Sequence, residues 1–178
     1  MILIPRNGHD VRYKKMKQRL KEEILLEYHQ HQGILDVFDY CLSEEEAKEM
    51  IIPYEYHLKH VNKFISFFKD MFAKYTCTVY FNNYIKKLNK EEKNRLGDVD
   101  FTIYKKLLKK QPGCVIVENI EELILLVKLS VLEISFVDYI FGQGEVVVQG
   151  NFDLSFPIYF QQDVVTKMVF NNRLFIRT

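Results

Sequence analysis

The most regular pattern of apolar and polar residues lies near the C-terminal end of the chain. Between residues 151 and 160, which read NFDLSFPIYF, every second side chain is large and apolar. A repeat of two residues is that of a β-strand with one buried face, so we expect this face to belong to the core. Pro157 has no amide hydrogen for a β-ladder, which favours an edge strand or a bulge. The apolar positions are Phe152, Leu154, Phe156, Ile158 and Phe160.

The segment before this strand also has the pattern of β-structure. Leu132, Ile134 and Phe136 alternate with other residues, and the phase changes near Val137 and Asp138, as a β-bulge would make it do. The glycines that follow predict tight turns between strands. We therefore expect an antiparallel meander, with turns at 142–144 and 150–151 and strands at 145–149 and 152–160.

Two interpretations remain for the C-terminal end. Residues 164–170 and 174–176, joined by Asn171 and Asn172, have the apolar content of a last β-hairpin. The alternative is a short helix at 162–170, because a short apolar segment does not distinguish strand from helix by its period.

The first part of the chain has the period of helices. Its strongest helix is predicted at 57–75, where apolar residues recur every three or four positions and Phe64 and Met71 widen the stripe. Each large side chain buried contributes about 2 kcal/mol, so this face is expected to form the central core helix and to cover the alternating strand face. The stripe consists of Leu58, Val61, Ile65, Phe68, Phe72 and Tyr75.

Other helices are indicated by their capping residues. Ser43 and Glu46 form the pattern of a capping box, and Asn119 and Glu122 resemble one. The fold class predicted is α+β, with a helical N-terminal two-thirds packed on a C-terminal antiparallel β-meander. The further expected elements are an amphipathic helix at 13–28 ended by Gly33, a helix from 43 to Pro53, one from Asn82 or Asn83 to Arg95 ended by Gly97, one from Asp100 to Pro112, one from 119 to 128, and short strands near 77–81 and 114–117.

The composition is that of one globular domain. The chain has 178 residues, 48% hydrophobic and 28% charged. A chain of this length buries about 70% of the surface that its unfolded form exposes, so it needs no disulfide or metal to fold. We expect a single domain over residues 1–178, helical over about 10–130 and a β-meander over about 131–177. The three cysteines, Cys41, Cys77 and Cys114, lack CxxC or zinc-ligand spacing, which favours reduced, mostly buried thiols.

The sequence does not predict a membrane span or a signal peptide. The most apolar stretch, residues 124–141, is interrupted by Lys128, Glu133 and Asp138, and the apolar run at the N-terminus ends at Pro5. We therefore expect a soluble, cytoplasmic protein. Lys greatly outnumbers Arg, and Ile, Asn, Phe and Tyr are common, which is typical of an AT-rich genome such as that of a low-GC bacterium or its phage.

No segment carries a motif for nucleophilic or phosphate chemistry, so we expect no cofactor and favour a non-enzymatic protein. Glu55, His57 and His60 invite a metal site, since side chains three residues apart on a helix can share an ion. The HExxH spacing and a third ligand are missing, and we interpret the histidines as boundary residues of a core helix. A metal-dependent enzyme around them is the remote alternative. His29 and His31 are interpreted as a solvated helix end.

Charge is more informative than any catalytic motif. Residues 33–55 contain seven acidic residues and one lysine, a net charge of −6, mixed with aromatic and aliphatic residues. Such a segment is typical of a surface that docks a basic protein; the alternative is an ordinary helix surface above core residues. The partner-binding residues predicted are Asp36, Asp39, Tyr40, Glu44, Glu45, Glu46, Glu49 and Tyr54.

Residues 86–110 have the opposite charge, with nine basic and four acidic residues and a net charge of +5. The main hypothesis is a small protein-binding module, of the regulator, inhibitor or immunity type, whose partner is another protein. The alternative is a nucleic-acid-associated protein that contacts phosphates through this segment, unless its lysines merely solvate a helix pair. The lysines concerned are Lys86, Lys87, Lys90, Lys105, Lys106, Lys109 and Lys110.

Overall fold

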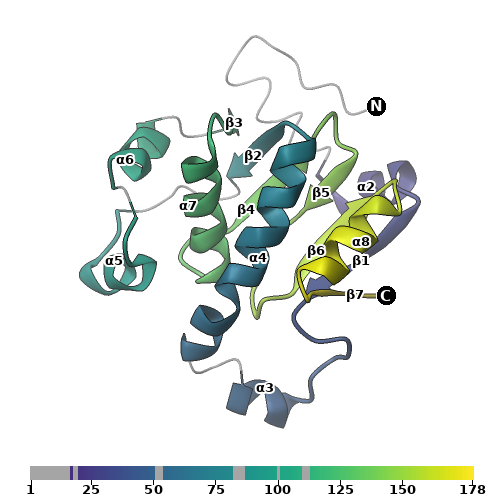
Figure 1. Cartoon of the computed structure of the whole chain (residues 1–178), viewed down its shortest axis with the longest axis horizontal. Coiled ribbons are helices and arrows are strands. Elements are labelled where there is room, and N and C mark those ends of the chain that lie inside the picture. Colours follow the sequence, from purple (N-terminus) through teal and green to yellow (C-terminus); the bar gives the residue numbers. More distant parts are fainter. Residues whose placement is uncertain (1–16, 18–19, 51–53, 82–86, 100, 110–112) are drawn as a thin grey trace.

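The computed structural model describes residues 17, 20–50, 54–81, 87–99, 101–109 and 113–178 (Figure 1). It confirms the α+β class: in these residues, seven helices accompany one antiparallel sheet of seven strands. Most of the helices belong to the N-terminal part of the chain, and four of the strands follow residue 136.

The sheet has the spatial order β3-β2-β4-β5-β6-β1-β7, and each neighbouring pair is antiparallel. Strands β4, β5 and β6 are consecutive neighbours and form the predicted meander. The strands are β1 (His31–Asp36), β2 (Cys77–Phe81), β3 (Cys114–Ile116), β4 (Val137–Phe141), β5 (Val146–Val148), β6 (Phe156–Phe160) and β7 (Phe175–Arg177).

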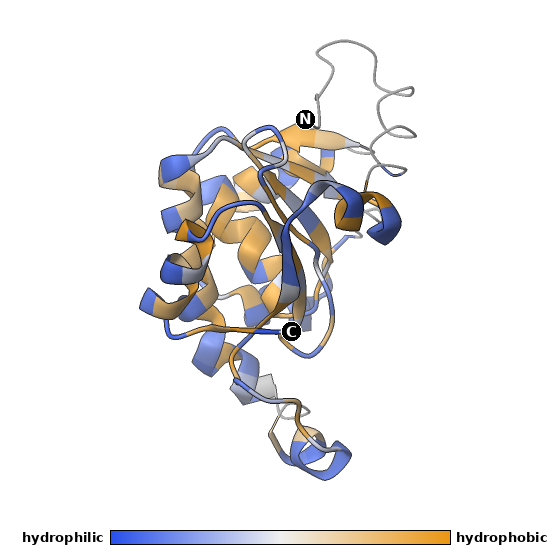
Figure 2. Cartoon of the chain, turned by 90° about the vertical axis from the view of Figure 1, so that its right-hand side faces the viewer, coloured by the Kyte–Doolittle hydropathy of each residue, from blue (hydrophilic) through white to orange (hydrophobic). Residues whose placement is uncertain are grey.

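One face of the sheet is covered by α4 (Tyr54–Lys74), flanked by α7 (Ile120–Val131) and α8 (Val164–Asn171), as Figure 1 shows. The ring of Phe64 lies 5.1 Å from that of Phe156, and the ring of Phe68 lies 4.4 Å from that of Tyr139. These contacts confirm that the helical stripe and the alternating strand face pack against each other and exclude water. Figure 2 shows that hydrophobic residues are concentrated in the sheet and in the helices that cover it.

The other face of the sheet carries a smaller apolar cluster. Leu25 of α2 (Glu22–Tyr28) is buried there together with Tyr80, Ile140 and Val147 from three strands. Antiparallel sheets tolerate such an uneven arrangement, because alternate side chains serve the two faces independently. The sheet therefore has a main core on the side of α4 and a minor one on the side of α2.

Three short helices lie at the periphery: α3 (Glu44–Met50), α5 (Lys90–Leu96) and α6 (Phe101–Lys109). Helices α5 and α6 each bury apolar residues against the main core, whereas α3 buries none. In Figures 1 and 2, α3 stands away from the rest of the protein at the end of an extended segment.

Strand β1 is an element that the sequence did not predict, and the expectation that Gly33 ends a helix is wrong. Gly33 lies inside β1, paired with Ile158. A Cβ atom at this position would lie 2.6 Å from the carbonyl oxygen of Arg177 and would collide with Ile176. The glycine is therefore explained by the close approach of β7 and not by a helix end.

The predicted alternation at residues 132–136 and 152–155 does not form strands. Leu132 is the C-terminal cap of α7, and β4 begins at Val137. Asp153 and Leu154 have positive φ angles of 58° and 56°, which break the extended backbone, so β6 begins only at Phe156. Phe152 is 59% exposed and packs on Phe136, whereas the remaining apolar residues of the pattern are buried as predicted.

Pro157 lies in an interior strand and not at an edge, which corrects the sequence prediction. Strand β6 pairs with β5 on one side and β1 on the other. The carbonyl of Pro157 accepts the amide of Gln149 (2.9 Å) where the pairing with β5 ends. A proline is tolerated there because the ladder needs only its carbonyl oxygen at that position.

The C-terminal segment adopts the alternative interpretation, since residues 164–171 form helix α8 and not a hairpin. Val165 and Val169, four residues apart, are buried on one side of it. At the other end of the chain, residues 13–16, 18 and 19 of the predicted first helix lie outside the described residues, and α2 is its described part.

Two details of the predicted helices also differ. Residues 82–86 lie outside the described residues, and α5 begins at Lys90 because Asn89 and Glu92 form a reciprocal capping box with distances of 2.8 Å. Leu58 is 45% exposed, so the buried stripe of α4 is centred on Phe64, Phe67, Phe68 and Met71.

Candidate docking site

The acidic segment predicted to bind a partner is a projecting arm, defined here as residues 37–50. It leaves β1 at Asp36, runs as a loop that bends at residues 37–40 and ends with α3. The backbone amide of Ser43 donates to Glu46 (2.9 Å), and the amide of Glu46 donates to the Ser43 hydroxyl (3.2 Å), so the predicted capping box is present. These hydrogen bonds, which lower the pKa of Glu46, form α3 without help from a buried face.

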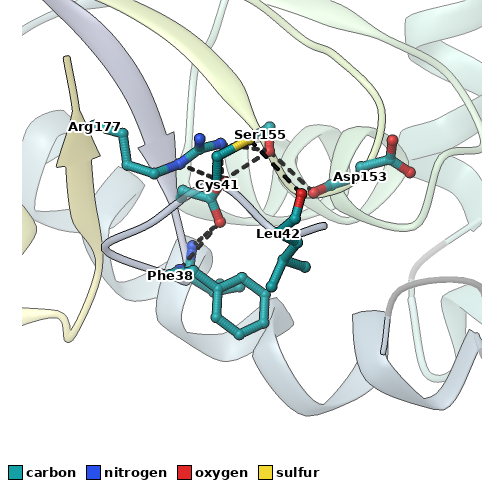
Figure 3. A network of polar contacts seen from close by, with 8 residues as sticks. Phe38, Cys41, Leu42, Asp153, Ser155 and Arg177 are labelled. Atoms are coloured by element: carbon teal, nitrogen blue, oxygen red, sulfur yellow. Dashed lines mark hydrogen bonds and ion pairs between the residues drawn. The ribbon is translucent and has the colours of Figure 1, made fainter. Parts of the chain in front are cut away.

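A polar network fixes the start of the arm (Figure 3). Asp36 is only 3% exposed. Its Oδ2 accepts from Nη2 (2.6 Å) and Nε (3.1 Å) of Arg177 in β7 and from the hydroxyl of Ser155 (2.8 Å). Its Oδ1 accepts the amides of Val37 (2.6 Å) and Phe38 (3.1 Å). The buried carboxylate is thus satisfied on both oxygens, as a charge at such a depth requires.

The network also involves Cys41. Its thiol lies 3.8 Å from the carbonyl oxygen of Leu42 and contacts the Arg177 guanidinium. Burial is the largest single influence on Arg177 and opposes its charge, but the hydrogen bond and the charge of Asp36, together with Cys41, outweigh burial and raise the pKa of Arg177. Cys41 is exposed, Cys77 is buried and Cys114 is half-buried, and none of these three described cysteines forms a disulfide.

The predicted docking residues divide into three groups. Asp36 is buried in the network just described, so it holds the arm and does not face a partner. Glu44 pairs with Lys48 (2.6 Å) and Glu46 caps α3. The remaining described members are exposed on the arm, whereas the side chain of Tyr54 lies outside the described part. The exposed members are Asp39, Tyr40, Glu45 and Glu49.

A pocket of about 580 Å³ lies between the arm and the start of α4. The rings of Phe38 and Tyr56 stack in parallel, with centroids 5.8 Å apart and an interplanar angle of 7°. Tyr56 also contacts His60, with ring centroids 4.4 Å apart. Because Phe38 belongs to the arm and Tyr56 to α4, the arm itself builds one wall. The lining residues are Val37, Phe38, Glu49, Met50, Glu55, Tyr56, Lys59 and His60.

His60 is the unusual member of this pocket. It is 8% exposed, and neither of its ring nitrogens has a hydrogen-bond partner. Burial, followed by the charges of Lys63 and Lys59, lowers its pKa to about 4, so the ring is neutral at pH 7. A buried polar group without a partner costs about 1–3 kcal/mol, which a ligand that supplies the missing hydrogen bond would recover.

Tyr56 is kept in its neutral form by the same surroundings. Burial and the nearby charge of Asp36 raise its pKa to about 12. The pocket thus offers neutral aromatic surfaces, a neutral imidazole and the carboxylates of Glu49 and Glu55, with Lys59 as its one cation among the residues that line it. The sequence showed the acidic and aromatic residues but not that Phe38 would meet Tyr56.

Two other histidines, His57 and His29, form contacts within the fold. His57 Nε2 lies 3.4 Å from Glu133 Oε1, and this hydrogen bond lowers the pKa of Glu133. His29, predicted at a solvated helix end, is instead buried, because α2 packs on the sheet: its ring nitrogens lie 2.8 Å from the carbonyl oxygens of Leu25 and Gly144. Among the described residues, no group of three or more His, Cys, Asp or Glu side chains is arranged to hold a metal ion.

The alternative, lysine-rich surface lies on α5 and α6, at the opposite side of α4 from α8 (Figure 1). Five of its seven lysines are described, and all five are exposed; Lys86 and Lys110 lie outside the described residues. The exposed ones are Lys87, Lys90, Lys105, Lys106 and Lys109. A second hollow of about 820 Å³ lies beside β1, β6 and β7 and contains none of the predicted site residues.

Comparisons of this chain with protein-family models, with curated proteins and with solved structures find no match. In the part of the chain that the structure describes, none of the helices has the length and apolar character to cross a membrane. The arrangement therefore defines an α+β protein with an antiparallel sheet, a projecting acidic arm and an aromatic pocket beside it.

Proposed function

We propose that this protein is a non-enzymatic binding module that docks another, basic protein through its arm. The partner would contact the exposed residues of the arm and the start of α4. In this proposal the protein acts in the cytoplasm of a bacterium, or of a cell infected by its phage, as a regulator, inhibitor or immunity-type protein.

One observation carries the proposal: α3 contributes nothing to the core, yet it forms a capped helix at the end of the arm. A helix of seven residues is only marginally stable in water, and a helix that buries no residue gains nothing from packing. The network around Asp36 nevertheless holds the start of the arm, and the capping box at Ser43 stabilises the first turn of α3. An arm that projects outward, with acidic side chains on α3 and the exposed Tyr40 in the loop before it, has the composition of a docking surface for a cationic partner.

Site-specific photo-crosslinking tests the location of the contact. A benzoylphenylalanine residue replaces Tyr40 in one variant and Phe170 in a control, and both positions are exposed, Tyr40 on the arm and Phe170 on α8. We expect the Tyr40 variant to crosslink one basic protein in native lysate, and the Phe170 variant not to do so. Reversal of charge at Asp39, Glu45 and Glu49 should remove this product.

Two results would contradict the proposal. If neither position yields a specific product, the arm is not a docking surface in that cell. If the Tyr40 and Phe170 variants capture the same protein with equal yield, the crosslinking is nonspecific. The same holds if the charge-reversed variant captures that protein with the yield of the unreversed one. The crosslinked protein must also bind the purified chain in solution, because capture alone does not establish a partner.

The second candidate is binding of nucleic acid by the lysine-rich surface. It is favoured by the five exposed lysines on and beside α5 and α6, none of which forms an ion pair within the described residues. Phosphate contacts make affinity fall steeply with salt, with a slope in log–log form of roughly 0.9 per contact on duplex DNA. Absence of binding to duplex or single strands at low salt removes this candidate.

A further inference from the structure

We propose that the pocket between Phe38 and α4 receives an arginine side chain of the partner protein. This inference deepens the proposed function and rests on it, since the arginine is taken to belong to the basic protein that docks on the arm.

The residues that line the pocket carry a net negative charge. Glu49 on the arm and Glu55 on α4 both line it, and Lys59 is the opposing charge among its lining residues. Asp36, whose charge also acts on Tyr56, is paired with Arg177. The carboxylates that remain come from two different elements, so a cation that enters between them would join the arm to α4.

The walls of the pocket favour a guanidinium over an ammonium group. Phe38 and Tyr56 present parallel aromatic planes, and Met50 adds a flexible apolar side chain. A planar guanidinium stacks on aromatic faces and is weakly hydrated, whereas an ammonium is a compact and strongly hydrated charge. The aliphatic part of the arginine would lie against Val37 and Met50, which also line the pocket.

His60 supplies the independent observation that points to a ligand. Its imidazole lines the pocket, is more than nine-tenths buried and has both ring nitrogens without a partner. A neutral imidazole has one nitrogen that accepts a hydrogen bond, and a guanidinium has five N–H donors in a fixed geometry. A guanidinium therefore matches an unused acceptor in the pocket as well as the two carboxylates.

The test uses small probes, so it does not need the partner. N-acetyl-arginine methylamide is titrated into the full chain and compared with the citrulline analogue, which has nearly the same shape but no charge. Signals of the His60 imidazole and the Tyr56 ring are followed by NMR. We expect saturable shifts of both residues with the arginine probe, at a Kd at least tenfold lower than with the citrulline probe or the lysine analogue.

Matched variants locate the binding. Glu49→Gln with Glu55→Gln removes the carboxylates of the pocket, whereas Glu44→Gln with Glu45→Gln removes the same charge from α3 outside it. We expect the first pair to weaken the arginine probe at least tenfold and the second to leave its Kd within twofold. His60→Phe should also weaken binding, and its folding is checked separately by thermal unfolding.

Several outcomes would overturn the inference. Equal binding of the citrulline probe would remove the role of charge, and equal binding of the lysine probe would remove the preference for guanidinium. NMR shifts confined to residues outside the pocket, or an unchanged Kd in the Glu49→Gln, Glu55→Gln variant, would place the binding site elsewhere.

A partner that crosslinks to the arm while no probe enters the pocket would refute this inference alone. A probe that binds while no partner is found would refute the proposed function alone.

Discussion

Helices α3 and α7 begin with the same kind of cap but differ in how many of their residues are buried. Ser43 and Asn119 each accept the amide of the residue three positions later, at 3.2 and 2.9 Å. Helix α7 then buries eight residues against α4 and the sheet, whereas α3 buries none. The same local signal thus starts a structural helix in one place and an outward-facing helix in the other. Packing, and not the cap, separates the core from the arm.

The largest effect is expected in the core. Phe68 contacts Tyr139 and Phe141 and is fully buried, so Phe68→Ala should lower the free energy of unfolding by about 3–5 kcal/mol. Met50→Ala on the arm is the matched control, and it should change the free energy by less than about 0.5 kcal/mol. Urea denaturation measures both. Comparable losses for the two variants would mean that the arm is part of the cooperative core.

The next effect concerns the network at the start of the arm. Asp36→Asn removes one partner of a buried ion pair, and because the Arg177 side chain is 20% exposed we expect a loss of about 2–3 kcal/mol. Arg177→Met in the same chain should recover part of this loss, since no guanidinium is then left without its partner. Calorimetry of the single and double variants measures the coupling. A single variant as stable as the wild type would show that the network does not hold β1 to β7.

A pH effect follows from His60. Its pKa is held at about 4 in the folded protein, below the ordinary value of 6.5, so the unfolded chain takes up this proton first as the pH falls. The stability contributed by the neutral ring is therefore complete above pH 6.5 and is lost as the pH falls toward 4. Between pH 6.5 and pH 4, we expect the free energy of unfolding to fall by about 2 kcal/mol more in the wild type than in the His60→Phe variant. Parallel pH profiles for the two proteins would contradict the assignment.

The smallest effects compare the two caps directly. Asn119→Ala should lower the free energy of global unfolding by about 1 kcal/mol, because α7 unfolds with the core. Ser43→Ala should instead increase hydrogen exchange only within α3 and leave global unfolding unchanged within about 0.3 kcal/mol. Exchange rates measured residue by residue distinguish the two cases. If Ser43→Ala and Asn119→Ala lowered the free energy of global unfolding equally, α3 would be coupled to the core.

Features encoded by neighbouring residues were predicted well. The existence of the core helix α4, the caps at Ser43 and Asn119, strand β2 and the turn at 142–144 each depend on residues a few positions apart, although the buried stripe of α4 is displaced from the predicted one. Strand β1 was missed because Gly33 is explained only by Arg177 and Ile176, at the far end of the chain. Helix α8 was ambiguous because its apolar segment is too short to show a period.

In the candidate site too, the features that depend on residues far apart in the chain could not be predicted. The acidic character of residues 33–55 was evident from the sequence, and the arm carries it. The burial of Asp36 was not evident, because its partners Ser155 and Arg177 lie 119 and 141 positions away in the chain. Nor could the contact between Phe38 and Tyr56, which forms the pocket wall, be inferred from spacing alone. Charge is a local property of a segment, whereas its availability to a partner depends on the fold.

The most direct test of the docking role is the association rate constant with the crosslinked partner at low salt. Asp39→Lys, Glu45→Lys and Glu49→Lys are combined on the arm, and Lys105→Glu, Lys106→Glu and Lys109→Glu are combined on α6 as a control of equal size. Because complementary charge accelerates encounter, we expect the arm variant to associate at least about tenfold more slowly. The α6 variant should associate as fast as the wild type or faster. An arm variant with the wild-type rate would contradict the account.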